Sequence, residues 1–128
     1  MPLDLTFLIW SVALALVQIV IAVLGAMLQV GLPALAGNRE SLPAITGWAG
    51  RAARAHRNML ENLGLFTALV LAAQLAGRAN GTTALGCELF FWGRLAYVPI
   101  FLIGIPWART GAWAVSIAGL LLVFSQLV

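Results

Sequence analysis

The segment RAARAHRNMLENLGLFTALVLAAQLA, residues 51–76, decides the fold that this sequence predicts. Its opening part, Arg51 to Glu61, contains three arginines, a histidine, an asparagine and a glutamate, and the remainder is almost wholly apolar. The whole chain has seven basic and four acidic residues, so charge is concentrated directly beside a run suited to hydrocarbon. Ionisable groups at membrane depth are costly and usually functional, so this cluster requires a polar partner.

The composition predicts an integral membrane protein. Of the 128 residues, 62% are hydrophobic and 9% are charged, and the mean hydropathy is +1.02. Soluble domains carry about 25% charged residues. The net charge of +3 does not indicate a nucleic-acid partner, because the arginines are not gathered on a solvated basic module. All seven basic residues are arginines, which suit buried ion pairs or anion binding.

Four apolar segments are each close to the roughly 20 residues that a membrane helix needs. They predict helices over roughly residues 5–30, 47–76, 83–103 and 107–127, separated by turn residues at 31–33, 78–81 and 104–106. The first segment lacks the features of a removable signal peptide, so we expect it to belong to the fold. Short connections make sequential helices antiparallel neighbours. The predicted fold class is therefore all-α, an integral membrane antiparallel four-helix bundle in a single domain over residues 1–128.

The loop arginines predict the orientation. Arg39 and the cluster from Arg51 to Arg57 follow the first helix, and Arg109 follows the third, whereas the opposite end carries Asp4 and Arg78. The positive-inside rule then places both termini outside the cytoplasm. We expect a multi-pass protein of a bacterial inner membrane.

Helical periodicity arranges the charged cluster in one stripe. At 100° per residue, Arg51, Arg54, Asn58 and Glu61 fall within an arc of about 80°, and Arg57 widens it to roughly 120°. His56 lies on nearly the opposite side, which favours a packing role for it. In hydrocarbon, such a stripe must face other helices or a water-filled cleft.

Two interpretations of this stripe remain open. Arg54 or Arg57 could pair with Glu61 and join the helices of the bundle. One carboxylate does not neutralise three arginines, however, which favours an anionic ligand. Glu40 and Glu88 could supply further charge, but Glu88 is expected near the far end of the third helix.

The third and fourth helices add further candidates. Arg94, Tyr97 and Phe101 share a face of the third helix at positions i, i+3 and i+7. Arg109 and Thr110 stand at the start of the fourth, where a guanidinium, a hydroxyl and free backbone N–H groups suit an anion or a thiolate. One histidine and one cysteine predict no metal site.

The motif Arg54-Ala-His-Arg-Asn-Met-Leu-Glu61, followed by Asn-Leu-Gly-Leu-Phe66, resembles the signature of the MAPEG family. These are the membrane-associated proteins of eicosanoid and glutathione metabolism. The resemblance extends over the chain, with Arg94 and Tyr97 on the third helix and Pro106-x-x-Arg109-Thr110 at the start of the fourth. It implies a homotrimer that binds glutathione between neighbouring subunits, near the cytoplasmic surface.

The resemblance also assigns roles to residues. It implies that Glu61 receives the ammonium of glutathione, that the arginines receive its carboxylates, and that Arg109, with Thr110, stabilises its thiolate. The substrate-binding set predicted from the stripe and the resemblance together is Arg51, Arg54, Arg57, Asn58, Glu61, Arg94 and Tyr97. Glutathione is thus the expected co-substrate, and membrane lipids and a hydrophobic small molecule or lipid are the other expected partners. A match of Arg39 to a further arginine of some members is weak.

Three departures from the family pattern bear on catalysis. Phe101 and Trp113 stand where catalytic members often have tyrosines, and Gly64 replaces a common proline. We therefore keep two hypotheses. The first, which we favour, is a glutathione transferase or peroxidase that attacks hydrophobic electrophiles or lipid peroxides. The second is a non-catalytic lipid-binding scaffold or accessory subunit of a larger membrane complex.

Overall fold

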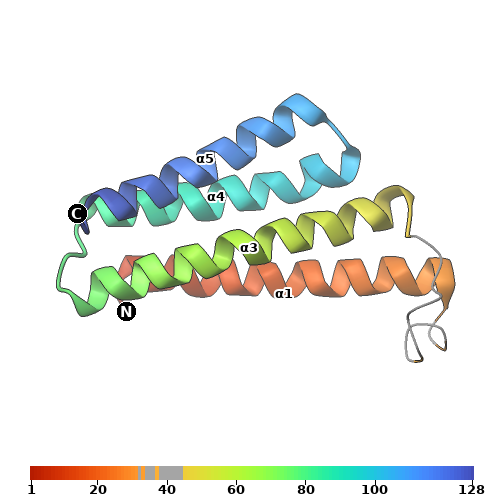
Figure 1. The fold of residues 1–128 in the computed structure, drawn as a ribbon, viewed down its shortest axis with the longest axis horizontal. Coiled ribbons are helices and arrows are strands. Elements are labelled where there is room, and N and C mark those ends of the chain that lie inside the picture. Colours follow the sequence, from red (N-terminus) through yellow and green to blue (C-terminus); the bar gives the residue numbers. More distant parts are fainter. Residues whose placement is uncertain (32, 34–36, 38–44) are drawn as a thin grey trace.

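Four long antiparallel helices make up the computed structural model, which describes residues 1–31, 33, 37 and 45–128. They are α1 (Leu3–Val30), α3 (Gly47–Leu75), α4 (Gly81–Ile103) and α5 (Pro106–Ser125) (Figure 1). Each is long and apolar enough to cross a membrane. The predicted all-helical four-helix architecture is confirmed, and the expected trimer stays a prediction.

Turn residues in the sequence set the helix ends. The Asn80 side chain accepts hydrogen bonds from the backbone N–H groups of Thr82 and Thr83, which caps the start of α4. Gly104 adopts the left-handed conformation (φ 87°) that ends α4, and Pro106 occupies the first turn of α5. Gly31 likewise has positive φ (83°) just after α1, as its predicted turn role requires.

The helices form two closely packed pairs. In the pair α1–α3, a Cβ atom added to Gly25 would lie 2.7 Å from the Ala49 Cβ, so the absence of a side chain at Gly25 lets these two helices pack closely. In the pair α4–α5, Gly86 and Gly119 approach so closely that neither leaves room for a Cβ atom. Small residues allow backbones to approach in this way in membrane helices.

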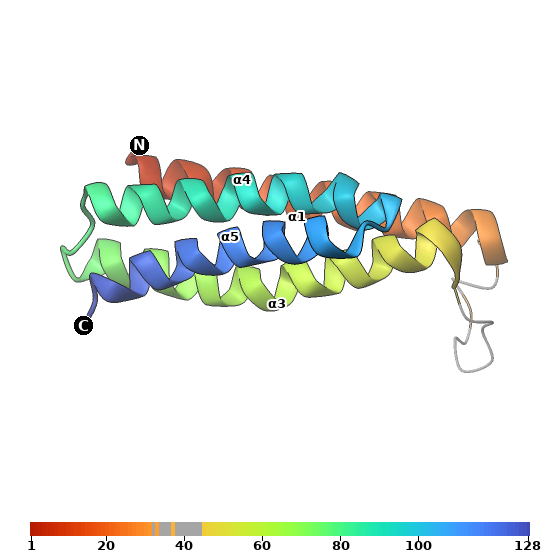
Figure 2. The ribbon, with the colours of Figure 1, turned by 90° about the horizontal axis from the view of Figure 1, so that it is seen from above.

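Both termini lie at the same end of the bundle (Figure 1), and the view from above shows the helices running side by side (Figure 2). At this end Asn80 Nδ2 donates to Gln126 Oε1 at 2.8 Å, joining the α3–α4 turn to the residues after α5. At the other end, Gln29 exchanges two hydrogen bonds with the Thr46 backbone, at 2.6 and 3.0 Å. These bonds join the last turn of α1 to the start of α3.

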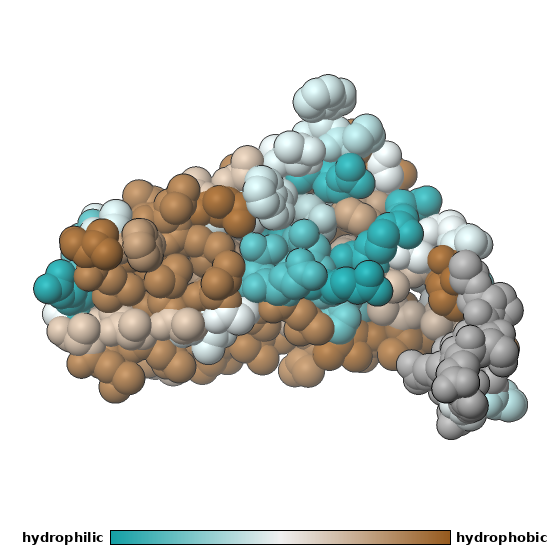
Figure 3. All heavy atoms as spheres, viewed as in Figure 1, coloured by the Kyte–Doolittle hydropathy of each residue, from teal (hydrophilic) through white to brown (hydrophobic). Residues whose placement is uncertain are grey.

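The surface divides into apolar and polar areas. Much of it exposes large apolar side chains, as expected of a lipid-facing bundle. In Figure 3 these residues, in brown, cover most of the half that lies near the two termini. On the same face, hydrophilic side chains gather between α3 and α5, toward the half that is remote from the termini (Figure 3). The candidate site lies in this polar area.

Candidate functional site

A buried arginine supports the candidate site from within the helix bundle. Arg94, on α4, is 1% exposed, and its Nη1 donates a hydrogen bond of 2.7 Å to Asn58 Oδ1 on α3. Asn62 lies one turn further along α3, and its Nδ2 donates to the Asn58 backbone oxygen (2.8 Å) and to Asn58 Oδ1 (3.2 Å). Asn58 therefore links two buried polar side chains.

Two donors of Arg94 are left over. Among the described residues its Nε and Nη2 have no hydrogen-bond partner, although both are buried. The guanidinium instead lies over the ring of Tyr97, 4.3 Å from the centroid. Burying a charge without full compensation is unfavourable, and such groups cluster at functional sites.

A hollow opens beside this pair. Its volume is about 140 Å³, and three helices contribute its wall. The lining residues are Asn58 from α3, Tyr97 from α4, and Arg109, Thr110 and Trp113 from α5. Residues far apart in the sequence, predicted as site residues from motif and helix position, thus meet at one place.

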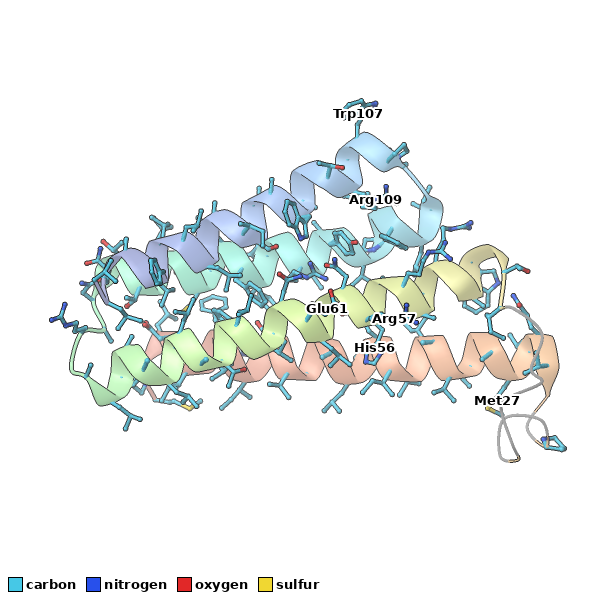
Figure 4. The ribbon with its side chains drawn as sticks, in the orientation of Figure 1. Met27, His56, Arg57, Glu61, Trp107 and Arg109 are labelled. Carbon is cyan, nitrogen blue, oxygen red and sulfur yellow. The ribbon has the colours of Figure 1, made fainter. Side chains whose placement is uncertain are left out.

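The two predicted catalytic residues differ in what they offer. The Arg109 guanidinium lies over the ring of Phe101, 5.1 Å from the centroid, and reaches from the first turn of α5 toward α4 (Figure 4). The Thr110 hydroxyl donates to the Pro106 backbone oxygen at 3.1 Å, within its own helix. Arg109 is therefore the stronger donor available to a ligand in the hollow.

Arg51 has a partner at the end of α4. Its Nε donates to the Leu102 backbone oxygen at 2.9 Å, and its side chain lies against Gly104. A cation at a helix C-terminus neutralises carbonyls that have no partner within the helix. Arg51 thus has a structural contact within the chain and does not line the hollow.

The rest of the predicted stripe is exposed. Arg54, Arg57 and Glu61 are exposed on the surface of α3. Figure 4 shows Arg57 and Glu61 on α3, in the region of the polar area of Figure 3. No arginine–carboxylate pair within 4.0 Å forms in the described part of the chain, so Glu61 does not neutralise Arg54 or Arg57 there. Arg39 and Glu40 lie outside the described residues.

His56 lies on the other side of α3, toward α1 (Figure 4), in agreement with its exclusion from the stripe. The sequence interpretation missed Asn62, which is 8% exposed and supports Asn58. Asn62 follows Asn58 by four residues, and helical residues at this spacing lie on the same face. This spacing could have predicted the contact from the sequence.

Comparisons with known proteins add one finding. The model of the MAPEG family matches residues 7–128, which is nearly the whole chain. No curated protein sequence and no solved structure matches the chain.

Proposed function

Because the chain belongs to the MAPEG family, we propose that it binds glutathione and activates the thiol for attack on hydrophobic electrophiles or lipid peroxides. The observation that carries this proposal is the convergence of Asn58, Tyr97, Arg109 and Thr110 on one hollow. Asn58, which lines this hollow, lies on α3 between the exposed Arg57 and Glu61. The proposal thus combines a thiol pocket with a charged surface for the rest of the tripeptide.

The charges of glutathione complement this region. At neutral pH the tripeptide has two carboxylates and one ammonium group, and α3 exposes Arg54, Arg57 and Glu61. The hollow of about 140 Å³ is lined by only five residues. In the proposed pose the cysteinyl part enters the hollow, and the carboxylates and the ammonium group lie along α3. Guanidinium groups bind carboxylates bidentately, which would fix the orientation.

The proposed chemistry begins with ionisation of the thiol. The sulfur loses its proton to water, and the Arg109 guanidinium stabilises the resulting thiolate. The thiolate then forms a bond to an electrophilic carbon, from which a leaving group departs. With a lipid hydroperoxide it would instead attack the outer peroxide oxygen and break the O–O bond. This gives the sulfenic acid of glutathione and a lipid alkoxide, which takes a proton from water. A second glutathione thiol then reduces the sulfenic acid, which gives glutathione disulfide and water. Arg94 acts indirectly in this scheme, by fixing Asn58 at the wall.

We also propose, from membership of the MAPEG family, that the chain assembles into a homotrimer in a bacterial inner membrane. Arg54, Arg57 and Glu61 would be costly against lipid, so we propose that a neighbouring subunit covers them and shares the glutathione site.

Ligand binding is tested by thermal unfolding of the detergent-solubilised protein. Glutathione at about 100 times its Kd should stabilise the folded state by about 2.7 kcal/mol and so raise the Tm.

Thiol-dependent conjugation of an aryl halide tests catalysis. Arg109→Ala should abolish turnover and leave the oligomer intact. Arg78→Ala, a change of an exposed arginine at the opposite end, should leave turnover unchanged. Absence of thiol-dependent turnover in the wild type would contradict the proposal that the protein is an enzyme.

A second function is favoured by an apolar groove. The groove has a volume of about 500 Å³ and lies between α3 and α5. Its lining residues are Leu65, Ala68, Leu69, Ile117, Leu120, Leu121 and Phe124. Phe101 on α4 and Trp113 on α5 lack the hydroxyls that tyrosines would bring to the neighbouring hollow. Under this alternative, the groove between α3 and α5 holds a lipid and no chemistry follows. A non-catalytic lipid-binding scaffold or accessory subunit of a larger membrane complex is therefore the alternative. Binding without turnover would support it.

A further inference from the structure

Two arginines and two aromatic rings form a continuous row at the candidate site. The Arg94 guanidinium lies 4.3 Å from the Tyr97 centroid, the Tyr97 and Phe101 centroids are 5.3 Å apart, and the Arg109 guanidinium lies 5.1 Å from the Phe101 centroid. The first three residues belong to α4, and Arg109 belongs to α5. The row therefore joins the buried arginine to the arginine that lines the hollow.

We propose that Phe101 is a positioning residue, whose ring face holds the Arg109 guanidinium at the hollow while leaving its charge and its N–H donors available to a thiolate. This inference rests on the proposed function, because it concerns how the Arg109 guanidinium is held in position to bind the thiolate of glutathione.

The position of Phe101 supports this role. Its side chain is 6% exposed, and the neighbouring Tyr97 is 4% exposed, so both rings are held by packing. Tyr97 precedes Phe101 by four residues, and helical residues at this spacing contact each other. A cation is attracted to the negative face of an aromatic ring, and the attraction grows as water is excluded. The ring thus restricts a long side chain that is otherwise free to sample many rotamers.

The chemistry of the ring explains why phenylalanine suits this place. A carboxylate would also hold Arg109, but it would neutralise the guanidinium and occupy its donors. A phenyl ring holds the cation without accepting its hydrogen bonds. No hydrogen bond from the Arg109 side chain to a protein acceptor forms within the described residues, which leaves its donors free for a ligand. The missing hydroxyl at position 101 is therefore compatible with an activated thiol.

The test compares ionisation of bound glutathione with binding of a probe that does not ionise. The thiolate fraction is followed by ultraviolet absorbance as a function of pH, and S-methylglutathione serves as the probe. Phe101→Leu should lower the thiolate fraction at neutral pH roughly three- to tenfold, as expected for loss of a cation–π contact. Its affinity for S-methylglutathione should be unchanged. Phe101→Tyr and Phe101→Trp, which retain an aromatic ring at this position, should keep the wild-type thiolate fraction.

The matched control is Phe91→Leu, on the same helix. The Phe91 ring contacts Phe7 (5.6 Å) and Trp92 (5.0 Å), so its loss should leave the thiolate fraction unchanged. If Phe101→Leu does not fold, Phe101→Met fills similar space without a ring face and should show the same loss of thiolate. A wild-type thiolate fraction in a folded Phe101→Leu or Phe101→Met protein would overturn the positioning role alone. A wild type that binds neither compound would overturn the proposed function.

Discussion

At the scale of single residues, the candidate site is built on the contacts that satisfy the buried charge of Arg94. Asn58 accepts one of its hydrogen bonds, and Tyr97 presents its ring to the guanidinium. The remaining donors have no partner among the described residues. Asn58 is therefore a structural partner of Arg94 and a lining residue of the hollow at once.

The first prediction concerns this double role. Asn58→Leu removes the acceptor and leaves Arg94 buried without a side-chain hydrogen bond from α3. We expect a loss of about 1.5–3 kcal/mol in unfolding free energy without ligand, as measured by denaturant titration in detergent. Asn58→Asp keeps an acceptor and should retain the stability. An Asn58→Leu protein as stable as the wild type would show that the hydrogen bond contributes little.

A second prediction separates two arginines of the predicted stripe. Arg51 donates to the Leu102 backbone oxygen, whereas Arg57 is exposed beside the hollow. Arg51→Ala should lower the stability by about 1 kcal/mol through loss of a cation at the end of α4, with little change in glutathione affinity. Arg57→Ala should weaken glutathione binding and leave the stability almost unchanged. Calorimetric titration and thermal unfolding of both variants check this, and the reverse pattern would contradict it.

At the scale of the helices, α4 and α5 are joined through backbone contacts. A Cβ atom on Gly119 would lie 2.8 Å from the Phe90 backbone nitrogen and still closer to the Gly86 backbone oxygen. Gly111, on the same helix, has nothing within 4 Å of such an atom. The pair therefore offers a controlled test of this packing.

We predict that Gly119→Ala separates α4 from α5 and costs about 1–3 kcal/mol through overpacking. Because both helices contribute to the hollow, glutathione binding should weaken as well. Gly111→Ala should instead be neutral or stabilise the protein by up to about 1 kcal/mol, since alanine is the better helix former. Thermal unfolding of the two variants decides, and equal stabilities would contradict the close approach of the helices.

The sequence predicted the helices well because their ends are set locally. The Asn80 cap, Gly104 and Pro106 act within one turn of chain, so the observed bounds differ from the predicted ones by a few residues. Which neighbouring helix each residue of the stripe contacts was not predictable from such local signals. Periodicity grouped Arg51 with Arg54, but contact with Leu102 depends on where α4 packs. That packing is a property of the tertiary structure.

At the scale of the whole molecule, the exposed apolar surface and the polar area call for different surroundings. The apolar side chains suit lipid, and the charges of α3 need a polar partner. Both termini and the α3–α4 turn lie at one end, and the candidate site lies toward the other (Figures 1 and 3). The site would then be near the cytoplasmic surface if the predicted orientation is right.

A fourth prediction tests this orientation. Cysteines introduced as Ala79→Cys and Ser125→Cys should react with a membrane-impermeant thiol reagent added outside intact cells. Thr46→Cys should react only after the cells are opened, because it lies at the opposite end of the bundle. The single native cysteine, Cys87, is buried and should not react. Labelling of Thr46→Cys in intact cells would reverse the predicted orientation.

The central claim is that the polar area of α3 and α5 holds a thiol tripeptide. A high-resolution density map of the protein, purified from its native membrane with glutathione present, tests it most directly. We predict a tripeptide-shaped density with its sulfur beside Arg109 and a carboxylate beside Arg54 or Arg57. Acyl chains or a partner helix at that position, with no tripeptide, would contradict the account.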